Sequence, residues 1–409
     1  MQSIILEEPY EFVPPVESDF WCWLMRFRLK GFLRKQFGVH SHETRHADRL
    51  KASIDEGKSV ILAPNHCRLS DPMVLGLLSA EIGSELFAMA SWHLFKESAY
   101  QRFIIRRLGA FSVYREGNDR QAVNQAIDIL VGGRRPLIIF AEGAVSRHND
   151  LMMEMMDGPA FIARQAAKRR EKEGKPGVVI HPVAIRYSYQ GDAEAAVADE
   201  LTRFEQAFSW QPQTHLSTVE RIGQIGEALL AVNEIEYVGA ARVGDRFERA
   251  QVLIEEVLER LEKKWLDGKS RPGESVVARV KALRTTILPD LIAKKVTPEE
   301  RHQRWLDLAA CYYVQQIDHY PRGYLQAEKN LPERIVETVE RMAEDYCDRI
   351  RYRGPMHCTM VVGEAIEVSP QRDRSAVKDP AMAAAGESLQ TMLDELVVER
   401  RRELFGEEG

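Results

Sequence analysis

The sequence predicts an α/β fold, with a mostly parallel central sheet flanked by helices and a large all-α insertion. Short apolar segments alternate with amphipathic ones over residues 59–187, a pattern typical of parallel strands covered by helices. Helical periodicity then dominates residues 193–353. Because strand character returns at residues 357–368, we expect the helical region to interrupt the sheet and not to follow it.

Composition excludes partners that are recognised by strong overall charge. The chain has 409 residues, of which 44% are hydrophobic and 29% charged, so it can bury a sizeable core. Its net charge of -6 gives no nucleic-acid signature, and we expect no nucleic acid partner. The five cysteines lack metal-ligand spacing and favour a reducing compartment without a metal site. No apolar run approaches the roughly 20 residues that span a bilayer, and no signal peptide is visible, so a cytoplasmic location is predicted.

Four regions are predicted along the chain. Residues 1–45 should form an N-terminal arm and an amphipathic helix, and residues 46–192 the α/β domain. Residues 193–356 should form the helical insertion. Residues 357–409 should supply a final strand and a C-terminal helix that complete the α/β domain.

The predicted helix at residues 20–37 is aromatic and basic and contains no acid. Its aromatic and basic residues are Phe20, Trp21, Trp23, Arg26, Phe27, Arg28, Lys30, Phe32, Arg34, Lys35 and Phe37. A helix of this kind suits the surface of an anionic membrane. It could instead pack on its own domain, with arginine stems covering apolar surface. Both interpretations stay open.

The main candidate for chemistry is the stretch 59–72, where an apolar strand leads to His66 and, five residues later, Asp71. Pro64 ends the strand, and Pro72 suits the first turn of the next helix. The two side chains therefore lie in a loop, where a carboxylate can fold onto an imidazole, fix its tautomer and stabilise the imidazolium. The alternative is that Asp71 only caps the helix and His66 is an ordinary loop residue.

Two more predicted strands end at charged side chains. Arg115 lies at the end of a strand at residues 108–116, and Glu142 at the end of one at residues 136–143. Ligands of parallel sheets bind beyond the carboxyl ends of the strands. We therefore expect His66, Arg115 and Glu142 to share one site.

Four segments in order resemble the motifs of the glycerolipid acyltransferase family, typified by 1-acylglycerol-3-phosphate acyltransferases. Asn65, His66 and Asp71 match its His-x-x-x-x-Asp motif. The other three motifs are matched by residues 109–115 (GAFSVYR), 140–143 (FAEG) and 180–185 (IHPVAI), and VVGEAIEV resembles the late strand of the family. The resemblance covers roughly residues 55–190 and 357–400 and implies a glycerol-3-phosphate acyltransferase-like fold.

The resemblance implies transfer of a fatty acyl group from acyl-CoA or acyl-carrier protein to a hydroxyl of a (lyso)glycerophospholipid such as 1-acylglycerol-3-phosphate, a step of phospholipid biosynthesis. The thioester is a co-substrate, and no cofactor is implied. His66 would be the general base and Asp71 its orienting partner. Transfer would be direct, because no serine or cysteine is placed as nucleophile.

The resemblance also implies roles for substrate-binding residues. Arg115 would bind the phosphate of the acceptor, the alternative being a strand-end salt bridge. Glu142 and Gly143 would shape the acceptor site, with Glu142 holding Arg115 or another donor. The predicted set is completed by Asn65, Gly109 and Arg147.

The third motif departs from the pattern of the family. Ala141, Ala144 and Val145 replace its proline, threonine and arginine, so one expected phosphate contact is missing, for which Arg147 or His148 could substitute. The helical insertion is not part of the minimal enzyme and resembles a divergent bacterial branch.

Alternatives to this function stay open. The chain could be a same-fold O- or N-acyltransferase with a different acceptor, or a non-catalytic membrane lipid-binding or scaffold protein. A cysteine nucleophile at Cys67 and a metal hydrolase built on His66 and Asp71 are further hypotheses. For an acyltransferase we expect a peripheral location at the inner face of the membrane, with residues 20–37 on its anionic surface.

Overall fold

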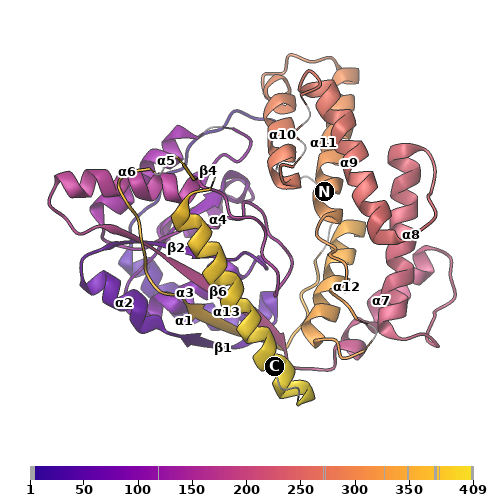
Figure 1. Cartoon of the computed structure of the whole chain (residues 1–409), viewed down its shortest axis with the longest axis horizontal. Helices are drawn as coiled ribbons and strands as arrows, with labels where there is room; N and C mark the ends of the chain where they lie inside the picture. Colours follow the sequence, from indigo (N-terminus) through magenta and orange to yellow (C-terminus); the bar gives the residue numbers. More distant parts are fainter. Residues whose placement is uncertain are drawn as a thin grey trace. The chain divides into compact units, whose positions relative to one another are not determined.

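A computed structural model describes residues 5–117, 119–269, 271, 273–326, 328–347, 350–372, 375–376 and 378–406. The chain divides into two compact units, drawn in Figure 1. The α/β unit comprises Tyr10–Gln190 and Gly354–Gly409, and the helical unit comprises Met1–Pro9 and Gly191–Arg353. The helical segment is therefore inserted between two parts of the α/β unit.

The α/β unit is built on a mixed, mostly parallel sheet. Its strands within the described residues are β1 (Val39–Arg45), β2 (Ser59–Pro64), β3 (Phe87–Ser91), β4 (Ala110–Val113), β5 (Leu137–Ile138), β6 (Val178–Tyr189), β7 (Met356–Val362) and β8 (Ile366–Glu367). They are ordered β1-β7-β6-β2-β5-β3-β4, with β8 paired to β6. The segment β6-β2-β5-β3-β4 is parallel throughout, and β6 is antiparallel to β7 and β8. The predicted fold class is confirmed.

Helices cover both faces of this sheet. They are α1 (Asp19–Phe37), α2 (Ala47–Asp55), α3 (Asp71–Ile82), the 3₁₀ turn η1 (Trp92–Phe95), α4 (Ala99–Arg107), α5 (Arg120–Gly132), α6 (Gly158–Lys172) and α13 (Pro380–Phe405). Figure 1 shows α5 and α6 on one side of the sheet and α1, α2 and α3 on the other.

The central strand β2 shows why the sheet needs cover on both faces. Its residues Ile61 and Ala63 belong to the core cluster that includes α5 and α6. The residues between them, Val60 and Leu62, are also buried. Since successive side chains of a strand point to opposite faces, β2 is apolar on both, as parallel strands between helical layers are.

The helical unit consists of six helices within its described residues. They are α7 (Ala193–Ala207), α8 (Thr218–Val238), α9 (Arg246–Trp265), α10 (Val276–Ile292), α11 (Pro298–Ile317) and α12 (Pro332–Cys347). Apolar side chains of α9, α10 and α11 form its main core cluster. Thr297 caps α11 by accepting the backbone N–H of Glu300, as its sequence predicts.

Buried arginine–glutamate pairs join successive helices of this unit. Arg221 binds Glu205 between α8 and α7. In the same way, Arg249 of α9 binds Glu234 of α8. Arg279 of α10 binds Glu262 of α9. A buried charge must be paired, so each of these bidentate contacts fixes the register of two neighbouring helices.

Several predicted boundaries differ from the structure. Strand β1 lies in a segment predicted to be arm and helix, because its sequence, VHSHETR, is too polar to indicate a strand. Strand β5 has only two residues of the predicted eight, and the single strand predicted at residues 357–368 is divided into β7 and β8. The predicted start of α5 at residue 118 lies outside the described residues, and the helix begins at Arg120, capped by Asp119.

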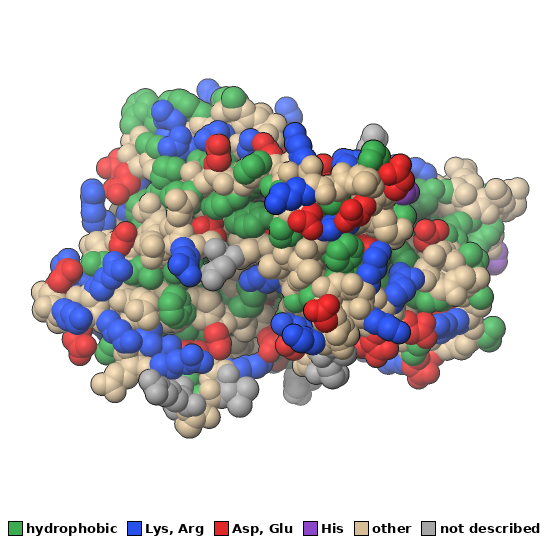
Figure 2. Space-filling view, turned by 90° about the horizontal axis from the view of Figure 1, so that it is seen from above, with side chains coloured by type: hydrophobic (Ala, Val, Ile, Leu, Met, Phe, Trp, Pro, Cys, Tyr) green, Lys and Arg blue, Asp and Glu red, His purple; other side chains and the backbone are tan. Residues whose placement is uncertain are grey.

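In the part of the chain that the structure describes, every helix is too short or too polar to cross a bilayer. On the face shown in Figure 2, basic and acidic side chains are interspersed.

Candidate active site

The loop between β2 and α3 brings His66 and Asp71 together. Nδ1 of His66 lies 2.8 Å from Oδ2 of Asp71. The chain turns sharply between them, with the backbone N–H of Asp71 donating to the carbonyl of Arg68. Asp71 is the first residue of α3, and the N-cap position belongs to Ser70. The carboxylate thus folds onto the imidazole, as expected of a loop, and does not serve only as a helix cap.

The carboxylate of Asp71 is fully buried and is held by two further donors. The Tyr187 hydroxyl donates to Oδ1 at 2.7 Å, and the Arg68 backbone N–H donates to Oδ2 at 2.9 Å. Burial, followed by the charge of Asp71, raises the pKa of Tyr187 well above its ordinary value, so this hydroxyl stays protonated. Sequence reasoning missed Tyr187, which in the sequence is one more residue of an apolar strand.

The imidazole of His66 stacks on the ring of Phe140, with 4.0 Å between the ring centroids. Its side chain is 15% exposed. Because Nδ1 faces a carboxylate, we assign the proton to Nδ1, which leaves the lone pair on Nε2. Among the described residues no hydrogen bond to Nε2 is formed, so this nitrogen can act as a base toward a bound molecule.

Asn65 anchors the start of the loop to the neighbouring strand. Its side-chain amide donates to the carbonyl of Ile185 at 2.9 Å and accepts the backbone N–H of the same residue at 2.7 Å. The side chain therefore continues the pairing of β2 with β6 beyond Pro64. This agrees with the hypothesis that Asn65 positions the loop.

Glu142 anchors the same loop from the other side. Its buried carboxylate accepts the backbone N–H of His66 at 2.7 Å and that of Met153 at 2.8 Å. Glu142 is predicted to hold Arg115 or another donor; the donors that the structure gives it are these two backbone N–H groups. Burial raises the pKa of Glu142 to about 7, although both backbone donors oppose the rise.

Arg115 lies two residues beyond β4, at the same edge of the sheet. Its guanidinium donates to the carbonyl of Gly143, the neighbour of Glu142. Burial, and then the charge of Arg115, lower the pKa of His93 to about 4, so His93 is neutral near pH 7. Sequence reasoning missed His93, although it follows the end of β3 by two residues, just as His66 follows β2.

The loop after β5 closes onto the backbone of His66. The backbone N–H of Ser146 donates to the carbonyl of His66 at 2.7 Å. The next residue, Arg147, has φ 63°, a left-handed conformation that is uncommon for residues other than glycine. The structure therefore brings Gly143 and Arg147 to the edge that holds His66.

Gly109 is not brought to this edge. It precedes β4 and so lies at the opposite, amino end of the strands. Its φ is 88°, and a Cβ there would lie 2.4 Å from the carbonyl oxygen of Leu86. The glycine is needed for close backbone approach, and its predicted place among the substrate-binding residues is not supported.

The described residues contain no cluster of three or more His, Cys, Asp or Glu side chains that could hold a metal ion.

Comparison with known families agrees with this geometry. Residues 39–186 match the acyltransferase family model, the glycerolipid acyltransferase family. This part of the chain is similar to that family. The matched span begins at β1 and includes every strand-end residue discussed above, and the match supports an enzyme that transfers acyl groups. No curated protein sequence matches the chain.

The raised pKa of Glu142 leads to a prediction for the pH dependence of the protein's stability. Between the ordinary value of 4.5 and the folded value of about 7, the folded chain holds more protons than the unfolded chain. The contribution of Glu142 to the free energy of unfolding should therefore fall as pH rises through this range, by on the order of 1 kcal/mol per pH unit.

Urea unfolding of the wild type and of Glu142→Gln across this pH range measures the effect, since the variant lacks the titrating group. We expect the free energy of unfolding of the wild type, minus that of the variant, to decrease with rising pH. A difference independent of pH would show that the carboxylate is ionised throughout.

Proposed function

We propose that this acyltransferase moves a fatty acyl group from acyl-CoA or acyl-carrier protein to a hydroxyl of a (lyso)glycerophospholipid such as 1-acylglycerol-3-phosphate, with His66 as general base. The 2.8 Å contact between Nδ1 of His66 and the buried Asp71 carries the proposal. The reaction needs a base because a hydroxyl is a poor nucleophile at neutral pH.

In this mechanism Nε2 of His66 takes the proton of the acceptor hydroxyl as its oxygen attacks the thioester carbonyl carbon. The carbon–sulfur bond then breaks, and the leaving thiolate takes the proton back from the imidazolium. Asp71 stabilises the imidazolium between these steps. Tyr187 and the Arg68 N–H keep the carboxylate aimed at Nδ1.

The surroundings of Cys67 favour direct transfer over a cysteine nucleophile. Its buried thiol lies within 3.9 Å of Asp71 Oδ1, 3.8 Å of Asn149 Oδ1 and 3.6 Å of the Ile185 carbonyl. Oxygen acceptors stabilise the protonated thiol, whereas a nucleophile must be a thiolate beside positive charge.

We further propose that Arg115 binds the phosphate of the acceptor. A planar guanidinium offers bidentate contacts to a phosphate. The position of Arg115 supports the role, because a chain of contacts through Gly143 and Glu142 links it to the backbone of His66.

The second candidate function is acyl transfer to a different acceptor. The side chains of Ala144 and Val145 offer no hydrogen-bond donor where the family resemblance expects a threonine and an arginine, and Ala141 is buried in the core. An acceptor with a smaller or uncharged head group, or an amine in place of the hydroxyl, would need fewer such donors.

Helix α1 supports a peripheral membrane location. Its buried residues Cys22 and Leu33 face the α/β unit, whereas Trp23 is 52% exposed and Phe27 71% exposed. Exposed aromatic rings beside basic side chains favour the surface of an anionic bilayer. We propose that α1 both packs on its unit and contacts the membrane.

The first prediction from this proposed function concerns the general base. We expect thiol release from palmitoyl-CoA in the presence of lysophosphatidic acid to fall by roughly 10² to 10⁴ in His66→Ala, and by no more than that in Asp71→Asn, which keeps the base. The exposed His302, on α11, supplies the control variant His302→Ala, which should keep the wild-type rate.

Wild-type turnover by His66→Ala would contradict the mechanism. Vesicle binding without turnover on a panel of donors and acceptors would instead favour a non-catalytic lipid-binding or scaffold protein.

The second prediction concerns the acceptor. Arg115→Ala should raise the KM for lysophosphatidic acid roughly 10- to 100-fold, because a charge-assisted hydrogen bond to phosphate is lost. The KM for monoacylglycerol, which lacks the phosphate, should not change. Arg120→Ala, which removes an exposed arginine at the start of α5, is the matched control. Equal effects on both acceptors would assign Arg115 a structural role.

The third prediction concerns the membrane. The double variant Trp23→Ala with Phe27→Ala should weaken sedimentation with phosphatidylglycerol vesicles, because exposed aromatic area is lost. Added salt should weaken wild-type binding as well. Val243→Ala, at a fully exposed apolar residue of the helical unit, is the control. Unchanged binding of the double variant would leave α1 as a helix that only packs on its own unit.

A further inference from the structure

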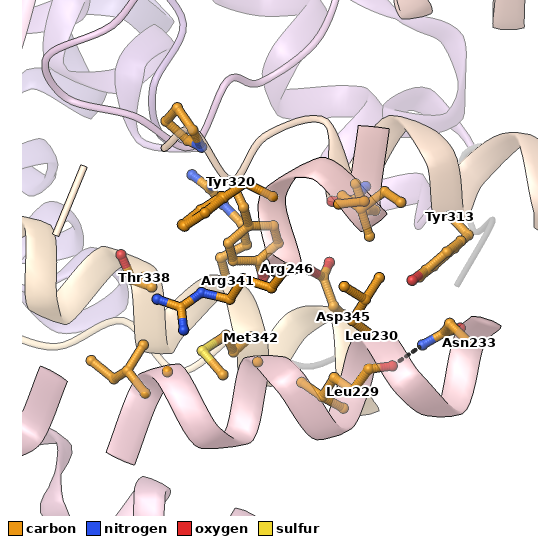
Figure 3. A pocket seen from close by; sticks show the side chains of 18 of the residues that line it. Leu229, Leu230, Asn233, Arg246, Tyr313, Tyr320, Thr338, Arg341, Met342 and Asp345 are labelled. Atoms are coloured by element: carbon orange, nitrogen blue, oxygen red, sulfur yellow. Dashed lines mark hydrogen bonds between the residues drawn. The ribbon is translucent and has the colours of Figure 1, made fainter. Parts of the chain in front are cut away.

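The helical unit contains a cavity of about 290 Å³ that acyl transfer at His66 does not use. Figure 3 shows side chains of α8, among them Leu229 and Asn233, facing side chains of α11 and α12, among them Tyr313, Arg341 and Asp345. A mostly apolar lining with a few polar groups is typical of a small-molecule site.

The cavity is long. Along α8 its lining extends from Val219 to Tyr237, which at 1.5 Å per residue corresponds to about 27 Å. Gly226 leaves this wall of the groove open, since no heavy atom outside the backbone of α8 lies within 4 Å of the position that its Cβ would occupy. At Gly223, also in this wall, that position is 3.1 Å from the guanidinium of Arg246. A long apolar groove of this kind fits an extended chain better than a compact ring system.

One end of the groove is aromatic. Tyr237 of α8 stacks on Tyr313 of α11, with 5.0 Å between the ring centroids. Burial raises the pKa of Tyr237 to about 12, so its hydroxyl stays protonated at neutral pH. It suits the apolar end of a ligand.

The other end carries the positive charge. Arg246, exposed at the start of α9, has its guanidinium next to Gly223. The guanidinium of Arg341, whose residue is 3% exposed, lies over the ring of Tyr320 at 4.8 Å. Arg322, two residues after Tyr320, binds Asp245, the residue before Arg246. This contact brings the Tyr320 segment, and with it Arg341, to the end of the groove that holds Arg246.

An acid also lines the groove, but one of its oxygens is already occupied. Oδ2 of Asp345 accepts the hydroxyl of Tyr320 at 2.6 Å. Among the described lining residues, two arginines thus face one aspartate. Charge complementarity therefore favours an anionic head group over a cationic one.

We propose that this cavity binds one single-chain anionic amphiphile, a long-chain carboxylate or its phosphate counterpart, with the chain along α8 and the head group at Arg246 and Arg341. The lining residues all belong to the helical unit, and the proposal does not depend on the function proposed for His66. It gives the helical unit a ligand of the chemical class that an acyltransferase meets as substrate or product.

Gly226 provides the sharpest test. Gly226→Leu places a side chain in the open groove, and leucine is a better helix former than glycine, so α8 should be kept. Gln224→Leu adds the same side chain at an exposed position of α8 that does not line the cavity. Isothermal titration calorimetry of the full chain with dodecanoate compares the two variants with the wild type.

We expect one dodecanoate to bind the wild type and Gln224→Leu equally, and Gly226→Leu to bind at least about tenfold more weakly because the groove is filled. Arg246→Gln should weaken dodecanoate binding several-fold and leave binding of dodecanol unchanged, because only the carboxylate uses the guanidinium. Dodecyl phosphate in place of dodecanoate distinguishes the two head groups.

Three results would overturn the proposal: no binding of dodecanoate to the wild type, equal affinity of Gly226→Leu and the wild type, or tighter binding of dodecyltrimethylammonium than of dodecanoate. His66→Ala separates the cavity from the acyltransferase site. We expect this variant to bind dodecanoate normally, whereas loss of binding would place the chain at His66 instead.

Discussion

Asp71 is a carboxylate without contact to water, and the arrangement of the site around His66 follows from that constraint. A buried charge is stable only where donors surround it. The structure supplies the imidazole of His66, the hydroxyl of Tyr187 and the backbone N–H of Arg68. Each donor comes from a different part of the loop or sheet. The hydrogen bonds to this carboxylate therefore fix the orientation of the His66 ring and the distance between β2 and β6.

The backbone of the loop is fixed in a similar way. Asn65 pairs with both backbone groups of Ile185, and Glu142 accepts the N–H of His66. Glu142 has a raised pKa because the effect of burial outweighs that of its two hydrogen bonds. Holding the loop therefore requires burying a carboxylate whose charged form is destabilised. Such a cost is common at functional sites, where positioning a reactive group takes precedence over stability.

The helical unit uses buried charge for a different purpose. Its arginine–glutamate pairs join neighbouring helices and set their register, while α8 keeps glycines where it faces the proposed amphiphile site. Close packing is normal in protein interiors, so an open apolar groove between helices supports the proposed site. The chain would then bind acyl chains in two independent places, one for chemistry and one in the inserted helices.

The sequence by itself determined the fold class, the strand ends that carry His66, Arg115 and Glu142, and the contact of His66 with Asp71. These follow from local periodicity, proline positions and a spacing of five residues, all of which depend on neighbours in the chain. Only the tertiary structure decided that Tyr187 is the second donor to Asp71, that Glu142 binds backbone, and that Gly109 lies at the far edge. Those facts depend on strand order and on register between segments that are distant in the chain, 116 residues apart for Tyr187 and Asp71, which no local pattern specifies.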